Sequence, residues 1–245
     1  MKYKVSLSTK IDPKKLKKGS GIIVIESDDY KKEEVSAIKK KGYIVLAYLS
    51  VGTIEKERSW WDKYKHLRLK RLGDWPNEYY VDVRKKEWQN HLYARTKTLM
   101  AKGYSGLWCD NLDVYEYCKS KEMFEACRQV LKELKRLSGH LMVNGGSEFF
   151  DKAMDKKLNL REIVSGVTQE EVFSRITNYS GKGKFGAQTK DMHKFYVRYM
   201  RRLKKNGVLT FLLEYTRNIL LKRQIKKFCR KYGMTGYCIS ENVDL

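Results

Sequence analysis

Short apolar runs alternate with helical patterns along the whole chain, and this alternation constrains the fold more than any other feature. Residues 21–25 form one apolar run, and residues 43–49 form the next. Between them, residues 31–41 have the spacing of an amphipathic helix that ends at Gly42. Strand, helix and strand within thirty residues are typical of a βαβ unit with buried parallel strands. The sequence therefore predicts an α/β protein.

The same alternation continues to the C-terminus without a linker. About nine candidate strands alternate with seven or eight helical patterns, and the strands are predicted at residues 3–8, 21–26, 43–49, 79–83, 105–109, 140–144, 162–167, 208–215 and 235–239. Eight parallel strands close a (β/α)8 barrel, and 245 residues is the usual size of one such domain. We therefore expect a single TIM barrel over residues 1–245, with residues 3–8 as an extra N-terminal strand.

Polar side chains recur where the predicted strands end, which favours a closed barrel over an open sheet. An open sheet gathers its functional groups at one switch point, whereas a barrel has them around one rim. The densest group follows the apolar run 105–109. Asp110 or Asp113 could instead cap the next helix, since Asp is a favoured N-cap residue. The strand-end residues are Glu26, Ser50, Asp82, Asp110, Asn144, Glu170 and Glu214.

Several kinds of chemistry leave no trace in the sequence. Neither a dinucleotide-binding G-x-G-x-x-G nor a phosphate-binding P-loop is present, and no G-x-S-x-G elbow occurs. The four histidines are scattered, and the five cysteines form no C-x-x-C pair, so we expect neither a metal nor a cofactor.

Apolar runs long enough to span a membrane are absent from the sequence. The first ten residues also lack the apolar core of an export signal. As written, the chain is expected to be cytoplasmic. If the natural gene encodes an upstream apolar segment, we expect a secreted or surface protein instead.

The chain is strongly basic, with 52 Lys and Arg against 29 Asp and Glu and a formal charge of +23. Such an excess attracts polyanions without saying which. Because the basic residues are spread through most predicted helices, we interpret them as a solvated, Lys-rich surface and do not expect nucleic-acid binding. The sequence leaves the oligomeric state open.

Carboxylates, amides and aromatic rings on one rim suit glycoside hydrolysis. That reaction needs two carboxyl groups that flank the scissile bond, one as acid and one as nucleophile or base. Aromatic rings also offer flat faces on which sugars stack. These residues alone indicate a carbohydrate-active barrel.

Three blocks of sequence point to one family. Residues 47–52 (AYLSVG) match a strand that ends in Y-x-S-V-G. Residues 80–84 and 103–115 (GYSGLWCDNLDVY) are similar to W-L-D-I followed by G-F-D-G-V-x-x-D-N-x-D-x-Y, and residues 166–173 (GVTQEEVF) place acids after a sixth strand. The chain thus resembles glycoside hydrolase family 114, the endo-α-1,4-polygalactosaminidase-like (β/α)8 barrels. It departs from the pattern at Glu26 and Ser105, where relatives carry Asp.

The resemblance implies that the catalytic acids follow strands four and six, at Asp110 and Glu170, with Glu171 as the adjacent competitor. We expect a retaining reaction with Asp110 as nucleophile, kept ionised by Asn111 amides, and Glu170 as the general acid/base with a raised pKa. The residues expected to bind substrate are Tyr48, Asp82, Asn111, Asp113, Tyr115, Asn144, Glu171, Glu214 and Tyr215.

The implied substrate is an amino-sugar polysaccharide, and the alternative is a catalytically silent barrel that binds a glycan or a polyanion. A cationic polymer and a protein of charge +23 should repel each other, unless the rim acids create a local negative field.

Overall fold

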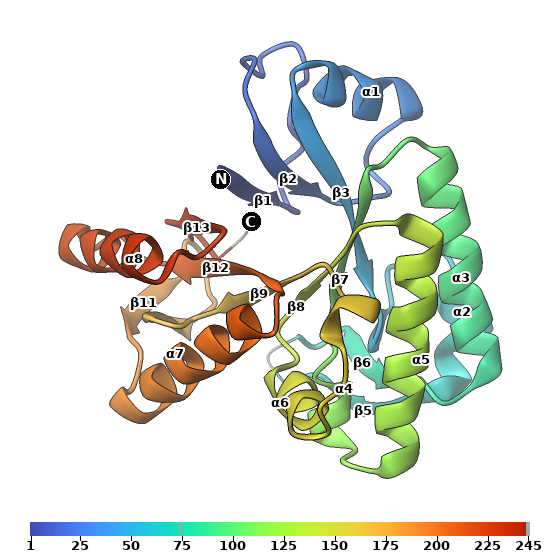
Figure 1. The fold of residues 1–245 in the computed structure, drawn as a ribbon. Helices are drawn as coiled ribbons and strands as arrows, with labels where there is room; N and C mark the ends of the chain where they lie inside the picture. Colours follow the sequence, from blue (N-terminus) through green and yellow to red (C-terminus); the bar gives the residue numbers. More distant parts are fainter. Residues whose placement is uncertain (74, 244–245) are drawn as a thin grey trace.

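The computed structural model describes residues 1–73 and 75–243. Eight parallel strands form one sheet that curls into a nearly closed barrel (Figure 1). Its last strand meets its first through one parallel bridge between Lys2 and Tyr237. In sheet order the strands are β1 (Tyr3–Ser6), β2 (Gly21–Ile25), β3 (Tyr43–Ser50), β7 (Gly106–Asp110), β8 (Leu141–Asn144), β9 (Gly166–Glu170), β12 (Leu209–Tyr215) and β13 (Gly236–Ser240). The predicted barrel is confirmed.

Six helices connect successive strands and cover the outside of the barrel (Figure 1). They are amphipathic: α5, for example, buries Val130, Leu131 and Leu134 at the spacing of one helix face. The six are α1 (Lys32–Lys40), α3 (Lys86–Ala101), α5 (Lys121–Ser138), α6 (Ser147–Asp155), α7 (Lys190–Lys205) and α8 (Ile219–Tyr232). Shorter turns are α2 (Trp61–Tyr64), α4 (Val114–Tyr117) and the 3₁₀ segments η1 (Lys65–Leu67) and η2 (Leu160–Glu162).

The extra strand is not the one that we expected from the sequence. β1 is the first of the eight barrel strands and pairs in parallel with β2. The additional strand is β6 (Glu78–Val81), which pairs antiparallel with β4 (Thr53–Glu55) and β5 (Arg68–Arg71) within the connection between β3 and α3. A second insertion, the hairpin β10 (Ser174–Asn178) and β11 (Lys184–Ala187), follows β9. Strand pairing depends on contacts between residues that are distant in sequence, so the alternation of apolar runs and helical patterns does not reveal it.

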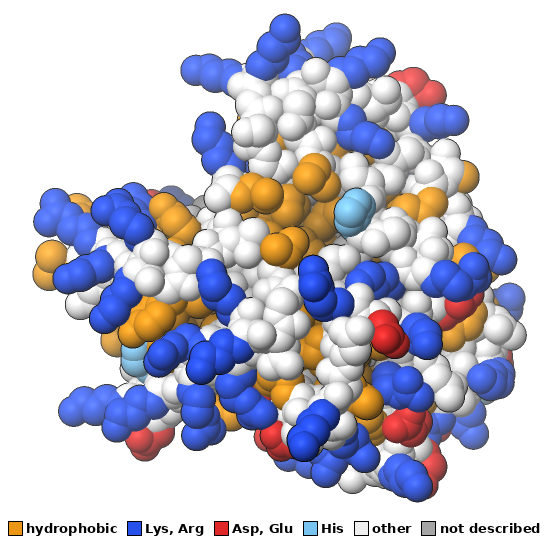
Figure 2. Space-filling model, viewed as in Figure 1, with side chains coloured by type: hydrophobic (Ala, Val, Ile, Leu, Met, Phe, Trp, Pro, Cys, Tyr) orange, Lys and Arg blue, Asp and Glu red, His pale blue; other side chains and the backbone are white. Residues whose placement is uncertain are grey.

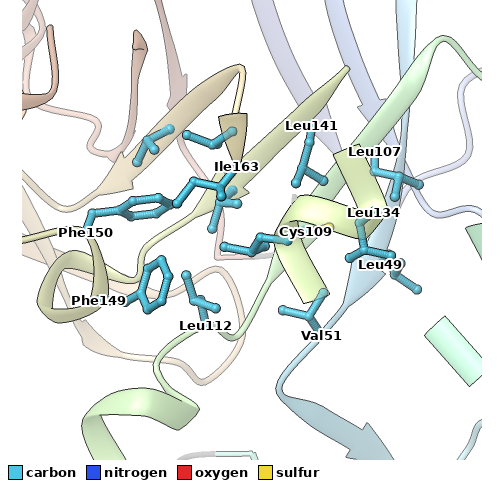
Figure 3. Packing of buried hydrophobic residues seen from close by; sticks show 14 of the residues in the cluster. Leu49, Val51, Leu107, Cys109, Leu112, Leu134, Leu141, Phe149, Phe150 and Ile163 are labelled. Carbon is cyan, nitrogen blue, oxygen red and sulfur yellow. The ribbon is translucent and has the colours of Figure 1, made fainter. Parts of the chain in front are cut away.

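Buried residues form two layers, because successive strand residues point to opposite faces. On β7, Leu107 and Cys109 belong to the large cluster between the barrel and its helices, and Figure 3 shows this packing beside Leu134 and Phe149. Trp108 points the other way, into a second cluster inside the barrel. The barrel interior is therefore filled by side chains and forms a floor beneath the strand ends.

Two further properties concern the chain as a whole. None of the helices in the described part of the chain is both long and apolar enough to cross a membrane. All five cysteines are free thiols.

Candidate active site

An open cleft of about 810 Å³ lies over the carboxyl ends of the strands. Its floor includes Trp108, and its centre is formed by Asp110, Asn144, Glu170 and Tyr215. Apart from Trp108, these are the last residues of β7, β8, β9 and β12, which are neighbours in the sheet. Parallel strands that end at one level therefore bring together side chains that lie up to 105 residues apart. Of the other predicted residues, Tyr48, Asn111 and Asp113 also line the cleft.

One side-chain amide joins the two predicted catalytic carboxyl groups. The Asn144 Nδ2 group donates to Asp110 Oδ1 at 3.1 Å and to Glu170 Oε1 at 2.5 Å. Because both oxygens bind the same nitrogen, they cannot be farther apart than the sum of these distances, about 5.6 Å. Carboxyl groups of retaining glycosidases lie about 5–5.5 Å apart, and those of inverting enzymes about 6.5–9.5 Å.

Each carboxyl group has a further donor of its own. Tyr215 donates its hydroxyl to Glu170 Oε2 at 2.6 Å, and the backbone N–H of Asn111 donates to Asp110 Oδ1 at 2.9 Å. Glu170 thus accepts on both oxygens, from Asn144 and from Tyr215. These contacts fix the rotamers of both acids before any ligand arrives.

Burial raises the pKa of both carboxyl groups. The pKa of Asp110 lies well above its usual value because of burial and then the charge of Glu170, which the bonds from Asn144 and Asn111 oppose. The pKa of Glu170 is raised by burial, against hydrogen bonds from Tyr215 and Asn144. The surroundings of Asp110 therefore raise its pKa, which is the opposite of the direction that we expected from the sequence. Two neighbouring carboxyl groups with raised pKa values share a proton readily.

The residue after each acid has a left-handed backbone. Asn111 has φ 62° and Glu171 has φ 57°, a region that L-residues other than Asn, Asp and Gly rarely adopt. At Glu171, the backbone N–H donates to Leu213 O at 3.0 Å and the side-chain oxygen Oε1 accepts from the N–H of Ile176. These bonds stabilise the unusual conformation. As a result, Glu170 and not Glu171 bonds to the amide that holds Asp110.

The side-chain amide of Asn111 does not bond to Asp110 as predicted. Its Nδ2 donates to Ser50 Oγ at 3.0 Å, Thr53 Oγ1 at 2.8 Å and Glu78 Oε1 at 2.9 Å. The Asn111 side chain therefore connects the end of β7 to the inserted antiparallel sheet by hydrogen bonds. Only the backbone N–H of Asn111 donates to Asp110.

Four predicted substrate-binding residues do not line the cleft, because each is engaged elsewhere. Asp82 forms a two-point ion pair with Arg84. Tyr115 is buried and packs edge-on against the ring of Phe124. Glu171 holds the turn after β9, as described above.

Glu214 is the fourth, and it is fully buried. Its carboxylate accepts the backbone N–H groups of Phe173 and Ser174 and the Ser174 hydroxyl, at 2.6–3.1 Å. Burial raises its pKa to about 7. Ser174 Oγ in turn accepts the N–H of Tyr215 at 2.9 Å. Glu214 therefore anchors the hairpin next to Glu170 and does not face the cleft.

Much of the cleft wall comes from the two insertions, which strand-end reasoning missed. Glu55 and Glu78 are register partners across β4 and β6, so their side chains share one face. At one end, the rings of Trp75 and Tyr179 meet edge to face with centroids 6.0 Å apart. The one usable signal in the sequence was the aromatic content of the long connection after β3. Residues from these insertions in the cleft are Glu55, Glu57, Arg58, Leu72, Gly73, Trp75, Pro76, Asn77, Glu78, Tyr80, Ile176 and Tyr179.

The cleft is acidic although the chain is basic. Its described lining contains one basic residue, Arg58, and seven acids, Glu26, Glu55, Glu57, Glu78, Asp110, Asp113 and Glu170. Arg58 is itself held by ion pairs to Glu26, Asp28 and Glu55 at 3.0–3.1 Å. Burial, together with the charge of Glu55, raises the pKa of Glu78 to about 7. The formal charge of the cleft lining is therefore opposite in sign to the net charge of the chain. No cluster of ligands for a metal ion occurs among the residues described.

Comparison with known proteins supports what this geometry suggests. The family model of the glycoside hydrolase family GH114 matches residues 1–241. The chain belongs to glycoside hydrolase family 114.

Its curated relatives are longer proteins. An uncharacterised protein of Methanocaldococcus jannaschii is 25% identical over 232 residues, which cover 86% of this chain and 64% of the relative. An uncharacterised protein of Thermotoga maritima is 20% identical over 205 residues, with 78% and 61% covered. The family 114 chain thus spans less than two thirds of either relative.

Solved structures with the same fold match it from end to end. The glycoside hydrolase domain of PelA from Pseudomonas aeruginosa superimposes with a TM-score of 0.81 at 19% identity, covering all of this chain and 96% of that one. Ega3 of Aspergillus fumigatus, solved in complex with galactosamine, gives 0.75 at 15% identity, with 100% and 92% covered. At such identities the likeness establishes the family 114 fold alone.

Proposed function

We propose that this protein hydrolyses glycosidic bonds in an amino-sugar polysaccharide with retention of configuration. The observation that carries the proposal is the Asp110–Glu170 pair, held within about 5.6 Å by one Asn144 amide. This limit, which applies to one oxygen of each carboxyl group, lies below the ~6.5–9.5 Å of inverting enzymes and supports a retaining reaction, in which one carboxylate bonds to the sugar directly.

We assign the nucleophile to Asp110 and the general acid/base to Glu170, following the family resemblance at strands four and six. Asp110 attacks the anomeric carbon as Glu170 gives its proton to the leaving oxygen, and the glycosyl ester forms as the glycosidic bond breaks. Glu170 then takes a proton from water, which attacks the same carbon and releases Asp110. The raised pKa values favour a pair that holds one proton between two carboxyl groups, the state that this reaction needs.

Cleft charge supports a cationic substrate. Seven acids against one arginine line the cleft, in a protein whose formal charge is +23. Protonated amino groups of a galactosamine-like polymer complement the acidic lining. A cleft lined by charges of one sign concentrates their electrostatic potential, so the basic exterior does not repel these amino groups inside the cleft. Glu57 and Glu78, which line the cleft and form no ion pair with Arg58, are the acids that we expect to meet such groups.

Aromatic side chains support a carbohydrate ligand. Trp75 is 50% exposed and forms part of the cleft wall together with Tyr80 and Tyr179. Ring faces of this kind bind the C–H surfaces of sugars, and their place at the edge of the cleft suits a polymer that extends beyond the reacting bond. Ega3, which has the same fold, was solved in complex with galactosamine, and this is in line with an amino-sugar ligand.

A panel of polymers tests the proposal. The protein is incubated with α-1,4-linked galactosamine polymer, its N-acetylated form, chitosan and a neutral galactan, and new reducing ends are measured with mass spectrometry of the products. We expect cleavage of the first polymer at the highest rate. Binding without any new reducing ends would instead support the silent, glycan-binding barrel.

Two variants test the roles. Asp110→Asn and Glu170→Gln should each lower kcat/KM by more than 1,000-fold, whereas the matched neighbour Glu171→Gln should retain at least a tenth of the activity. With azide and an activated aryl glycoside, Glu170→Gln should yield a glycosyl azide of retained configuration and Asp110→Asn one of inverted configuration. Equal losses at Glu170 and Glu171, or exchanged configurations, would contradict the assignment.

A further inference from the structure

The positive charge of this protein is concentrated on two neighbouring helices. α7 and α8 together contain 30 residues with 13 Lys and Arg and a single acid, Asp191, and so carry +12 of the chain's +23. The helices α1, α3, α5 and α6 contain 12 basic and 9 acidic residues. Basic residues thus occur in most helices, as expected from the sequence, but in α7 and α8 a single acid balances them.

The two helices lie side by side. Arg201 of α7 stacks over the ring of Tyr232 in α8 at 4.9 Å, and Lys204 donates to the carbonyl oxygen of Gly233. Figure 1 shows the pair on the side of the barrel away from α3 and α5, and Figure 2 shows blue side chains crowded over it at the left of the view. We call this surface the α7–α8 face.

Most of these basic groups are free to meet a partner. Eleven of the thirteen side chains are exposed. Ion pairs within the described residues engage only Arg202, with Asp151 and Asp155, and Lys222, with Glu241. On α7, helical spacing aligns Lys194, Arg198, Arg201 and Lys205 in one outward row. The row is therefore a continuous strip of unneutralised charge.

An apolar pair lies at one end of the same face. Ile219 and Leu220, in the first turn of α8, are each 66% exposed, more than any other large apolar residue among those described. Helical spacing places Ile219 in line with Arg223 and Lys226, and Leu220 in line with Lys227. Exposed apolar residues beside a basic helix face are typical of segments that lie in a membrane interface, with cations among the head groups and apolar side chains below them.

We propose that the α7–α8 face docks this protein on a bilayer that contains anionic lipids. The partner is a lipid surface because the face joins charge with exposed apolar side chains, which a soluble polyanion cannot bury. None of the described residues that line the acidic cleft belongs to α7 or α8, so the two surfaces share no residues. The proposal does not depend on which ligand the acidic cleft binds.

Vesicle sedimentation of the full chain tests this proposal. Binding is compared for vesicles of phosphatidylglycerol and phosphatidylcholine and for vesicles of phosphatidylcholine alone. We expect binding to the anionic vesicles that weakens steeply with salt, and at least 100-fold weaker binding to neutral ones.

Two variants with equal charge change locate the binding surface. The first, Lys194→Glu, Lys226→Glu and Lys227→Glu, changes exposed residues of the α7–α8 face. The second, Lys40→Glu, Lys97→Glu and Lys132→Glu, changes exposed residues of other helices. Each lysine near an anionic surface contributes about fivefold in partitioning, so the first variant, which also adds three negative charges, should bind at least about 100-fold more weakly. The second should change binding less than about threefold, and equal losses in both would overturn the proposal.

A third variant distinguishes a bilayer from a soluble polyanion. Ile219→Ser with Leu220→Ser should weaken vesicle binding by about tenfold and leave binding to a DNA duplex or polyphosphate unchanged. Vesicle binding that is indifferent to this pair, or weaker than duplex binding at equal phosphate concentration, would refute the lipid partner. Circular dichroism of each variant confirms that it is folded.

Discussion

The hydroxyl of Tyr215 offers the sharpest test of the proposed chemistry. It donates to Glu170 Oε2 at 2.6 Å, and this bond lowers the pKa of Glu170 against the effect of burial. Tyr215→Phe removes the donor and leaves the ring in place. A hydrogen bond to a charged group contributes about 1.5–3 kcal/mol, and one pKa unit corresponds to about 1.4 kcal/mol. The pKa of Glu170 should therefore rise by about one to two units.

The sign of the kinetic effect follows from the role of Glu170. A general acid must hold its proton, so the alkaline limb of kcat/KM reports its ionisation in the free enzyme. A higher pKa moves this limb to higher pH, and the ratio of variant to wild-type rate should grow as pH increases. Because Asp110 and Glu170 are coupled, the apparent values belong to the pair.

The assay measures reducing ends from an amino-sugar oligomer between pH 4 and 9 for both proteins. Ionisation of the substrate amines affects both equally and cancels in the ratio. Tyr48→Phe is the matched control, because Tyr48 also lines the cleft but has no hydrogen bond to either acid among those described. An alkaline limb that stays in place in Tyr215→Phe, or moves to lower pH, would refute the assignment of Glu170 as the acid.

Three further outcomes follow from the structure. Burial raises the pKa values of Glu78 and Glu214 to about 7, so at pH 5 both are protonated in the folded state. As pH rises from 5 to 8 each loses this proton, and the free energy of unfolding should fall by about 2–3 kcal/mol for each group. Urea titrations at both pH values check this, and a rise in the free energy of unfolding would contradict it. Gly52→Ala should unfold the protein or abolish activity, since its Cβ would lie 1.9 Å from the carbonyl oxygen of Asn111, whereas Gly73→Ala, with open space around it, should be neutral in thermal melts. Trp75→Ala should raise KM for long oligomers at least fivefold and leave kcat on an aryl glycoside unchanged; an equal loss on both would place the ring at the reacting bond.

Local sequence determined the elements and the ends of the central strands. A helix was predicted at residues 31–41, and α1 is observed at Lys32–Lys40, because an amphipathic pattern that ends in Gly42 specifies a helix without help from the rest of the chain. Asp110 and Glu170 were placed after apolar runs, and both are the last residues of buried strands. These features depend on neighbouring residues alone: side chains alternate between the two faces along a strand, and a glycine permits the left-handed backbone that ends a helix.

Tertiary structure decided which of these residues meet. The amide of Asn144 lies between acids 34 and 26 residues away, and Glu170 is chosen over Glu171 by a left-handed turn that contacts with Leu213 and Ile176 stabilise. Asp82 follows β6 and Glu214 is the penultimate residue of β12, yet bonds to Arg84 and to Ser174 of β10 hold them away from the cleft. Strand pairing, loop insertions and the charge of the cleft lining all depend on neighbours that are distant in sequence. Their energies arise only when the chain is folded, so no local pattern encodes them.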